Sequence, residues 1–244
     1  MRSAKHIALI YIIIMVCTFS LSGCSGAGYE GKDLVDRAKE LHTGLEAAHI
    51  TVREYIRGET ERGDGADKQN SPVVQEIRYR FVGEVMQYMY IGRDAATGEE
   101  YYEFNNGTEL DTWHTGDSGW SFAAKGSEGY YSYTRMNRHY FADGAQLLDD
   151  HIYAVKNAKV TNEVGGLKTV RIEYSDDKIS EIEQMSGVSD YTQRYSVDTA
   201  ILGGRCTRQE ISYKKDGRIY VYSIAIEAED PSVPIERAEP EELQ

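Results

Sequence analysis

Short segments that alternate between apolar and polar residues fill most of this 244-residue chain, and they favour a fold built on antiparallel sheet. Residues 73–82 show the pattern most clearly, because Ile77, Tyr79 and Phe81 fall on one face of an extended strand and charged residues fall on the other. Comparable strand and hairpin patterns cover residues 50–59, 85–115, 169–174 and 206–228. The sequence therefore predicts a chain of neighbouring strands.

Turn residues between these segments predict how the strands are connected. Asn106-Gly107 suits a type I′ hairpin turn, in which two consecutive residues have positive φ, and Asp216-Gly217 marks the turn of a second hairpin. The polar stretch 58–71 predicts a long loop instead. The last strand, residues 219–228, is apolar on both faces, which predicts a central position in the sheet.

Three segments have helical periodicity instead. Leu34, Ala38, Leu41 and Leu45 recur at three- and four-residue steps and predict an amphipathic helix over residues 32–48. Two shorter helices are predicted at residues 146–155 and 177–185. We therefore predict an α+β domain at residues 32–230, a curled antiparallel sheet of about 8–11 strands around the leading helix. Residues 231–244 are acidic and rich in proline, which predicts a flexible tail.

The N-terminus predicts where the protein is located. Arg2 and Lys5 precede an uncharged apolar run at residues 7–16, which is shorter than the ~20 residues that span a bilayer. The four residues 21–24, Leu-Ser-Gly-Cys, resemble the bacterial lipobox. That resemblance implies that residues 1–23 are a lipoprotein signal peptide, that Cys24 is lipidated and that residues 24–31 are a tether. The protein would then be lipid-anchored at the cell membrane, facing outside the cytoplasm; the alternative is an ordinary secretory signal with a chance cysteine.

Charge and cysteine usage exclude several classes of partner and site. The formal net charge of −13 repels nucleic acid, so no nucleic-acid partner is predicted. Of the three cysteines, Cys17 leaves with the signal and Cys24 is the lipid site. Cys206 then has no partner for a disulfide within the chain, and we predict it to be a small buried hydrophobic residue.

No catalytic or metal site is predicted. Residues 116–119, Gly-Asp-Ser-Gly, match the nucleophile motif of chymotrypsin-like proteases, and His49 precedes them as the histidine does there. The spacing is too short for the two barrels of that family, and the four residues are turn formers, so we interpret them as a hairpin turn. The histidines are scattered, and no metal or cofactor is expected. Residues 64–70 are interpreted as a loop, with weak calcium binding as the alternative.

A family resemblance follows from the order of these features. The lipobox, the leading helix, the aromatic meander, the short helical segment 176–185 and the closing hairpin 195–228 together resemble lipoproteins of the LolA/LolB-like fold. In the closing hairpin, Tyr195, Val197 and Asp198, followed by Gly203-Gly204, resemble a strand pattern of the family. The resemblance implies an open, incomplete barrel with an apolar concave face capped by helices. In carriers of this type that cavity holds acyl chains, and other members use it for protein recognition.

Nineteen tyrosines suit either an ordinary sheet or a cavity wall. If a cavity exists, we predict that aromatic and methionine side chains line it: Met86, Tyr88, Tyr90, Trp113, Trp120 and Phe122. Alternation alone also permits the opposite face. The predicted function is a membrane-anchored, non-catalytic binding module for a lipid or other apolar ligand. The alternative is a regulatory or sensing lipoprotein that recognises another envelope protein.

Overall fold

The structure is a computed structural model that describes residues 33–34, 44–57, 71–135, 155–174, 176–198 and 205–241. The predicted signal peptide, Cys24 and the tether lie outside these residues, as do residues 58–70 and nearly all of the helix predicted at 146–155. Among the described residues, no helix is long and apolar enough to cross a membrane.

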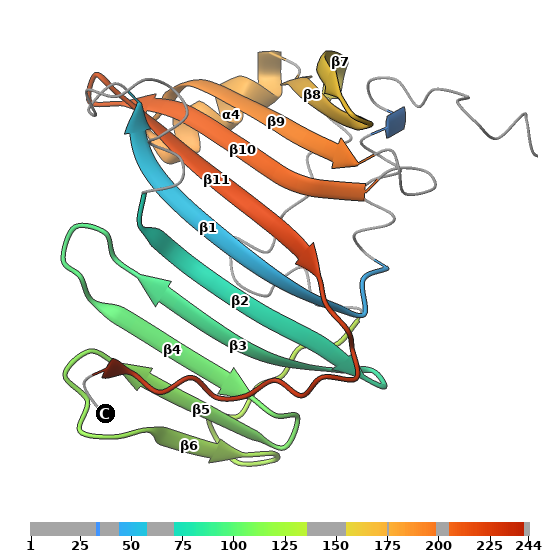
Figure 1. The fold of residues 1–244 in the computed structure, drawn as a ribbon. Coiled ribbons are helices and arrows are strands. Elements are labelled where there is room, and N and C mark those ends of the chain that lie inside the picture. Colours follow the sequence, from blue (N-terminus) through green and yellow to red (C-terminus); the bar gives the residue numbers. More distant parts are fainter. Residues whose placement is uncertain are drawn as a thin grey trace, which may run out of the picture.

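Eleven antiparallel strands form a single sheet in the described part of the chain (Figure 1). The strands are β1 (Ala47–Arg57), β2 (Val73–Val82), β3 (Val85–Arg93), β4 (Glu100–Asn105), β5 (Glu109–His114), β6 (Ser121–Ala124), β7 (Val155–Val164), β8 (Leu167–Tyr174), β9 (Ser189–Asp198), β10 (Arg205–Lys215) and β11 (Arg218–Ala228). Helix α4 (Asp176–Ser186) connects β8 to β9, as the periodicity of residues 177–185 predicts. The strand prediction for residues 73–82 is confirmed without a shift at either end.

The strand order is β6-β5-β4-β3-β2-β1-β11-β10-β9-β8-β7, so two meanders meet at the pair formed by β1 and β11. In that pair Ile50 lies opposite Ile226 and Val52 lies opposite Ile224, and all four side chains are buried. The prediction of a central last strand is therefore confirmed. The order begins at β6 and ends at β7 without pairing them, so the sheet of the described residues is an incomplete barrel.

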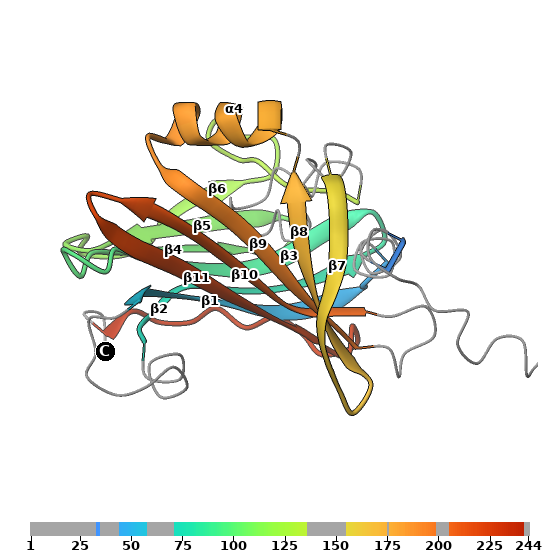
Figure 2. The ribbon, with the colours of Figure 1, turned by 90° about the horizontal axis from the view of Figure 1, so that it is seen from above.

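The sheet curls, which gives it an inner and an outer face (Figure 2). Helix α4 and the segment that follows β6 lie on the inner face, and residues 231–241 lie on the outer face. The buried apolar side chains form two clusters, and the larger one lies on the inner face. Ile179 of α4 and Tyr133 pack against this larger cluster. The buried members of that cluster come mainly from the central strands: Leu34, Ala48, Ile50, Val52, Val74, Ile77, Tyr79, Phe81, Met86, Tyr88, Val170, Val197, Ile224 and Ile226.

The two predicted hairpin turns differ in the structure. Asp216 and Gly217 have φ values of 50° and 80°, so both residues are in the left-handed region that a type I′ turn requires. The type I′ prediction for Asn106-Gly107 is wrong, because only Gly107 has positive φ, at 93°. Asn106 instead accepts hydrogen bonds on its side-chain oxygen from the backbone N–H groups of Thr108 and Glu109, at 2.9 and 2.8 Å, which stabilises a longer loop.

The leading helix is not confirmed. Residues 33–34 are helical, but residues 35–43 lie outside the described part of the chain, and β1 begins at Ala47. The predicted helix end at residue 48 is therefore wrong, and so is the placement of His49 at that end. Ala48 is fully buried between Tyr79 and Ala228 of the flanking strands, and this packing outweighs the helix propensity of alanine. Val155, the predicted end of the helix at 146–155, is the first residue of β7.

The described part of the C-terminal segment, residues 231–241, differs from the free tail that its composition predicts. It follows the outer face of the sheet, where Ile235 and Ala238 pack against buried side chains of β3–β5. Arg80 of β2 donates to the backbone oxygens of Pro231 and Ser232, at 3.4 Å each. We refer to residues 231–241 as the strap.

Candidate functional site

The inner face is apolar at its centre. Ile50, Ile77 and Ile224 point inward from β1, β2 and β11, and each is at most 4% exposed. Inner-face positions on these strands recur every second residue, which follows from strand geometry and from the observed register. These aliphatic side chains therefore form a packed apolar core at the middle of the inner face.

A buried carboxylate organises the β3–β5 side of the inner face. Glu103 of β4 is 6% exposed and accepts hydrogen bonds from the hydroxyl groups of Tyr88, Tyr101 and Tyr131. The Tyr101 and Tyr131 bonds end on the same oxygen, Oε2, at 2.5 and 2.6 Å. Tyr133 packs beside them, with its ring centroid 5.6 Å from that of Tyr88. We refer to these four tyrosines and Glu103 as the tyrosine cluster.

Two of these tyrosines come from residues 130–135, which cross the inner face. The backbone N–H of Met86 donates to the oxygen of Tyr133 at 2.9 Å, and Asn105 Nδ2 donates to the oxygen of Tyr131 at 2.9 Å. Arg135 Nη1 donates to Glu46 Oε1 at 2.7 Å. This part of the inner face is therefore covered by the protein's own chain.

The phenols of the tyrosine cluster serve as hydrogen-bond donors. Burial, followed by the charge and hydrogen bonding of Glu103, raises the pKa of Tyr88 and Tyr101 well above the ordinary value. The same causes raise the pKa of Tyr131. A phenol whose pKa is raised keeps its proton at neutral pH. The cluster therefore attaches residues 130–135 to the sheet through tyrosine hydroxyls that stay protonated.

A cavity of about 430 Å³ opens beside this covered region. Its wall combines inner-face side chains of the central strands with the turn after β3: Glu54, Val74, Gln75, Tyr90, Gly92, Arg93, Asp94, Ala95, Ala96 and Tyr222. Tyr90 adjoins the tyrosine cluster, since its ring centroid is 5.9 Å from that of Tyr101. A Cβ added to Gly92 would lie 2.9 Å from the Tyr90 hydroxyl oxygen. The absence of a side chain at Gly92 thus makes room for the Tyr90 ring along the cavity wall.

The six residues predicted to line a cavity are divided between the two faces. Met86 and Tyr88 are buried in the inner apolar cluster, and half-buried Tyr90 packs against it and lines the cavity. Trp113 and Trp120 belong to the outer-face cluster beneath the strap. Phe122 of β6 lies opposite Asp111 of β5 on the outer face, and its side chain is 68% exposed. The structure thus brings Met86, Tyr88 and Tyr90 together and places the other three on the opposite face.

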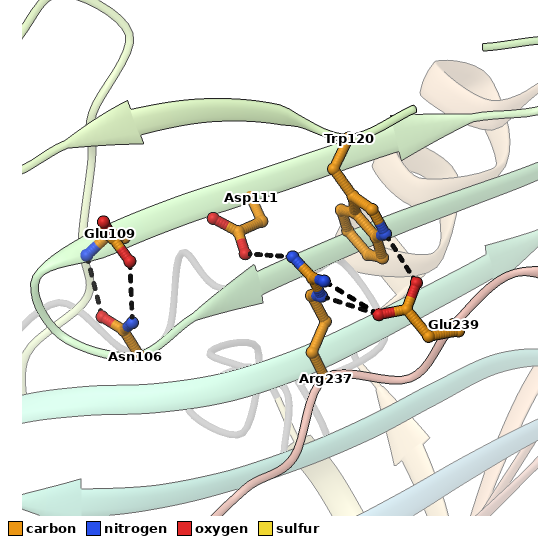
Figure 3. A network of polar contacts seen from close by, with 6 residues as sticks. All are labelled: Asn106, Glu109, Asp111, Trp120, Arg237 and Glu239. Atoms are coloured by element: carbon orange, nitrogen blue, oxygen red, sulfur yellow. Dashed lines mark hydrogen bonds and ion pairs between the residues drawn. The ribbon is translucent and has the colours of Figure 1, made fainter. Parts of the chain in front are cut away.

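On the outer face, the strap is held by a network around one arginine (Figure 3). Arg237 Nη1 is 3.0 Å from Asp111 Oδ2, and its Nη2 is 2.9 Å from Glu239 Oε1. Trp120 Nε1 donates to Glu239 Oε2 at 3.0 Å, and the Arg237 guanidinium carbon lies 4.7 Å from the centroid of the Trp120 ring. Asp111 has a side chain only 7% exposed, so Arg237 provides the opposite charge that a buried carboxylate requires.

Replacing Arg237 with methionine is expected to make stability more pH-dependent. Burial raises the pKa of Asp111, and the hydrogen bond from Arg237 opposes that rise. A carboxyl group whose pKa is raised by folding stabilises the folded state at pH values below its pKa in the unfolded chain. This contribution is lost as the pH rises through its pKa in the folded state. Removing Arg237 raises that pKa further, so the variant should lose about 1–2 kcal/mol at neutral pH and less in acid. Urea unfolding at a series of pH values measures this. In an Asp111→Asn background the pH-dependent part should shrink to the contribution of Glu239, whose pKa is lowered by the hydrogen bond from Trp120 and also by Arg237. An undiminished pH dependence there would contradict the assignment to Asp111.

The residues of the protease-like motif lie apart in the fold. Ser118 is exposed in the turn between β5 and β6, and His49 is on β1, where its Nε2 is 3.0 Å from Glu76 Oε1. Strands β2, β3 and β4 separate β1 from β5. Asp117 shapes the turn, since its side chain accepts from the N–H of His114 at 2.9 Å. Among the described residues, no group of three histidine, cysteine, aspartate or glutamate side chains could hold a metal ion.

Comparisons with known proteins find similarity in structure only. No family model matches the sequence, and no curated protein matches it. LprF from Mycobacterium bovis is 13% identical, with a TM-score of 0.45 over 86% of this chain and 96% of LprF. The Mycobacterium tuberculosis lipoprotein LppX is 10% identical, with a TM-score of 0.44 over 85% of this chain and 97% of LppX.

A LolA-superfamily protein from Nitrosomonas europaea is 9% identical, with a TM-score of 0.25 over 84% of this chain and 95% of that protein. All three TM-scores are below 0.5, so the functional proposal below depends on the geometry of this chain.

Proposed function

We propose that this protein is an extracytoplasmic lipoprotein, anchored through Cys24, that binds a lipid or other apolar ligand on the inner face of its incomplete barrel. The observation that carries the proposal is the 430 Å³ cavity, which opens at one end of an apolar inner face. Ligand sites in proteins are typically concave, largely apolar and furnished with a few polar groups. The cavity combines both kinds of side chain, since Val74, Ala95 and Ala96 line it together with Glu54, Gln75 and Tyr90.

Anchoring is proposed from the sequence of residues 1–24. A basic start, an apolar run too short to span a bilayer and a cysteine in a lipobox-like context support a lipid anchor. Two acyl chains on that cysteine would hold the protein at a membrane surface. An acidic surface disfavours additional attraction to anionic lipids.

Native mass spectrometry of residues 25–244 produced in bacteria, followed by lipid extraction, tests ligand binding directly. We expect a stoichiometric acyl species that is lost on extraction with organic solvent. A Gly92→Leu variant should retain less of it, because the new side chain enters the cavity and displaces the Tyr90 ring. Gly119→Leu is the matched control, since an added Cβ there meets no atom within 4 Å. A bare protein mass, together with no uptake of a neutral fluorescent lipid probe, would contradict lipid binding and favour recognition of an envelope protein.

A further inference from the structure

The cavity carries unmatched hydrogen-bond acceptors, and these bear on the chemistry of the ligand. Gln75 is on β2 opposite Gly92 of β3, and its side-chain oxygen is buried without a hydrogen-bond partner in the described part of the chain. A buried acceptor without a donor is costly. Rotation of the side-chain amide can present that oxygen to the cavity that Gln75 lines.

Glu54 supplies a second acceptor, with a negative charge. It is half-buried on β1 opposite Tyr222 of β11, and both residues line the cavity. Burial and a hydrogen bond to Tyr213 raise the pKa of Tyr222, and the charge and hydrogen bonding of Glu54 raise it further. Tyr222 is therefore a protonated, uncharged neighbour of Glu54.

Three arginines of the described residues near Glu54 are engaged elsewhere. Arg53 Nη1 donates to the backbone oxygen of Ser71 at 2.5 Å, and Arg57 Nη2 lies 3.6 Å from Glu210 Oε1. Arg93, which also lines the cavity, is bonded through Nε to Glu100 Oε1 at 2.6 Å. Within the described ranges no lysine or arginine forms an ion pair with Glu54. Among the described residues, the cavity thus has one carboxylate with no lysine or arginine paired to it.

We infer that the ligand is an amphiphile whose polar end is a protonated amine, seated between Glu54 and Gln75, with its apolar chain along the inner face. This inference rests on the proposed function and specifies its ligand class. An ammonium group carries hydrogen-bond donors for the side-chain oxygens of Gln75 and Glu54, and its charge is opposite to that of a carboxylate. The rings of Tyr90 and Tyr222 add favourable faces for a cation. A fatty acid would instead place its carboxylate against that of Glu54, which is repulsive.

Three amphiphiles of equal chain length test the inference: dodecylamine, dodecanol and laurate, each below its micelle concentration. Displacement of a neutral fluorescent probe from residues 25–244 gives a Kd for each. We expect the amine to bind about tenfold or more tighter than the alcohol, since a charge-assisted hydrogen bond is stronger than a neutral one. Laurate should bind most weakly.

Variants at residue 54 separate charge from folding. Glu54→Gln should bring the amine and the alcohol to about equal affinity without weakening the alcohol. Glu54→Lys should invert the order in favour of laurate. Glu99→Gln, which removes the same charge from an exposed position, should behave as the unaltered protein. If the three amphiphiles bind the unaltered protein equally, or laurate binds best, the inference is wrong while ligand binding stands. If none of them displaces the probe and no lipid co-purifies, the proposed function itself fails.

Discussion

Replacing Trp113 with alanine is expected to lower the free energy of unfolding by about 3–5 kcal/mol. Trp113 is 1% exposed beneath the strap. Its ring meets that of Tyr102 edge-on at a centroid distance of 5.4 Å, and its Nε1 donates to the backbone oxygen of Asp117 at 3.1 Å. The substitution would open a large cavity and remove this hydrogen bond. Urea unfolding followed by far-ultraviolet circular dichroism measures the loss.

Phe122 provides the matched control on the same face. It is 68% exposed, so Phe122→Ala should change the free energy of unfolding by no more than about 0.5 kcal/mol. Equal losses for the two variants, or a loss below about 1 kcal/mol for Trp113→Ala, would contradict the packing described for the outer face.

Replacing Glu103 with alanine is expected to lower the free energy of unfolding by about 3 kcal/mol, because hydrogen bonds to a charged group contribute more than neutral ones. The change removes the acceptor shared by Tyr88, Tyr101 and Tyr131. Residues 130–135 should then separate from the sheet more often. Hydrogen exchange at the Met86 amide, which donates to the Tyr133 oxygen, should speed up more than exchange in β1 and β11.

Glu128→Ala serves as the control for Glu103→Ala. Glu128 is exposed in the loop after β6, so its loss should have little effect on stability or exchange. An unfolding free energy for Glu103→Ala equal to that of the Glu128 variant would show that the tyrosine cluster adds nothing to stability. Unchanged exchange at Met86 would show that it does not hold residues 130–135.

The sequence predicted the sheet better than it predicted its faces. Strand β2 and the turn at Asp216-Gly217 follow from local patterns, since alternation and positive φ are decided by neighbouring residues. Both faces of β3 carry apolar side chains, however, because one belongs to the inner face and the other faces the strap. Alternation separates Trp113 from Tyr88 only when the strand register is known. The six predicted lining residues were therefore drawn from both faces.

The polar groups at the inner face escaped the sequence analysis for a related reason. A glutamate in a strand usually indicates a solvent-facing position. Glu103 is buried because its partners Tyr88 and Tyr131 lie 15 and 28 residues away in sequence. Glu103 shares one face of β4 with Tyr101 and Asn105. This shared face is the local signal that could have indicated its buried position. Glu54 and Gln75 gave no signal, because their shared cavity depends on the pairing of β1 with β2 and β11.

The strand order also determines when the sheet can be completed. The meander β1–β6 consists of neighbours in sequence, and so does the meander β7–β11, so each can form from local contacts. The pairing of β1 with β11 joins the two ends of the described domain and carries the largest loop-closure cost. Because the chain is synthesised from its N-terminus, one edge of β1 stays unpaired until β11 has been synthesised. During that interval its backbone can pair with other chains, and this period is when the protein is most exposed to aggregation.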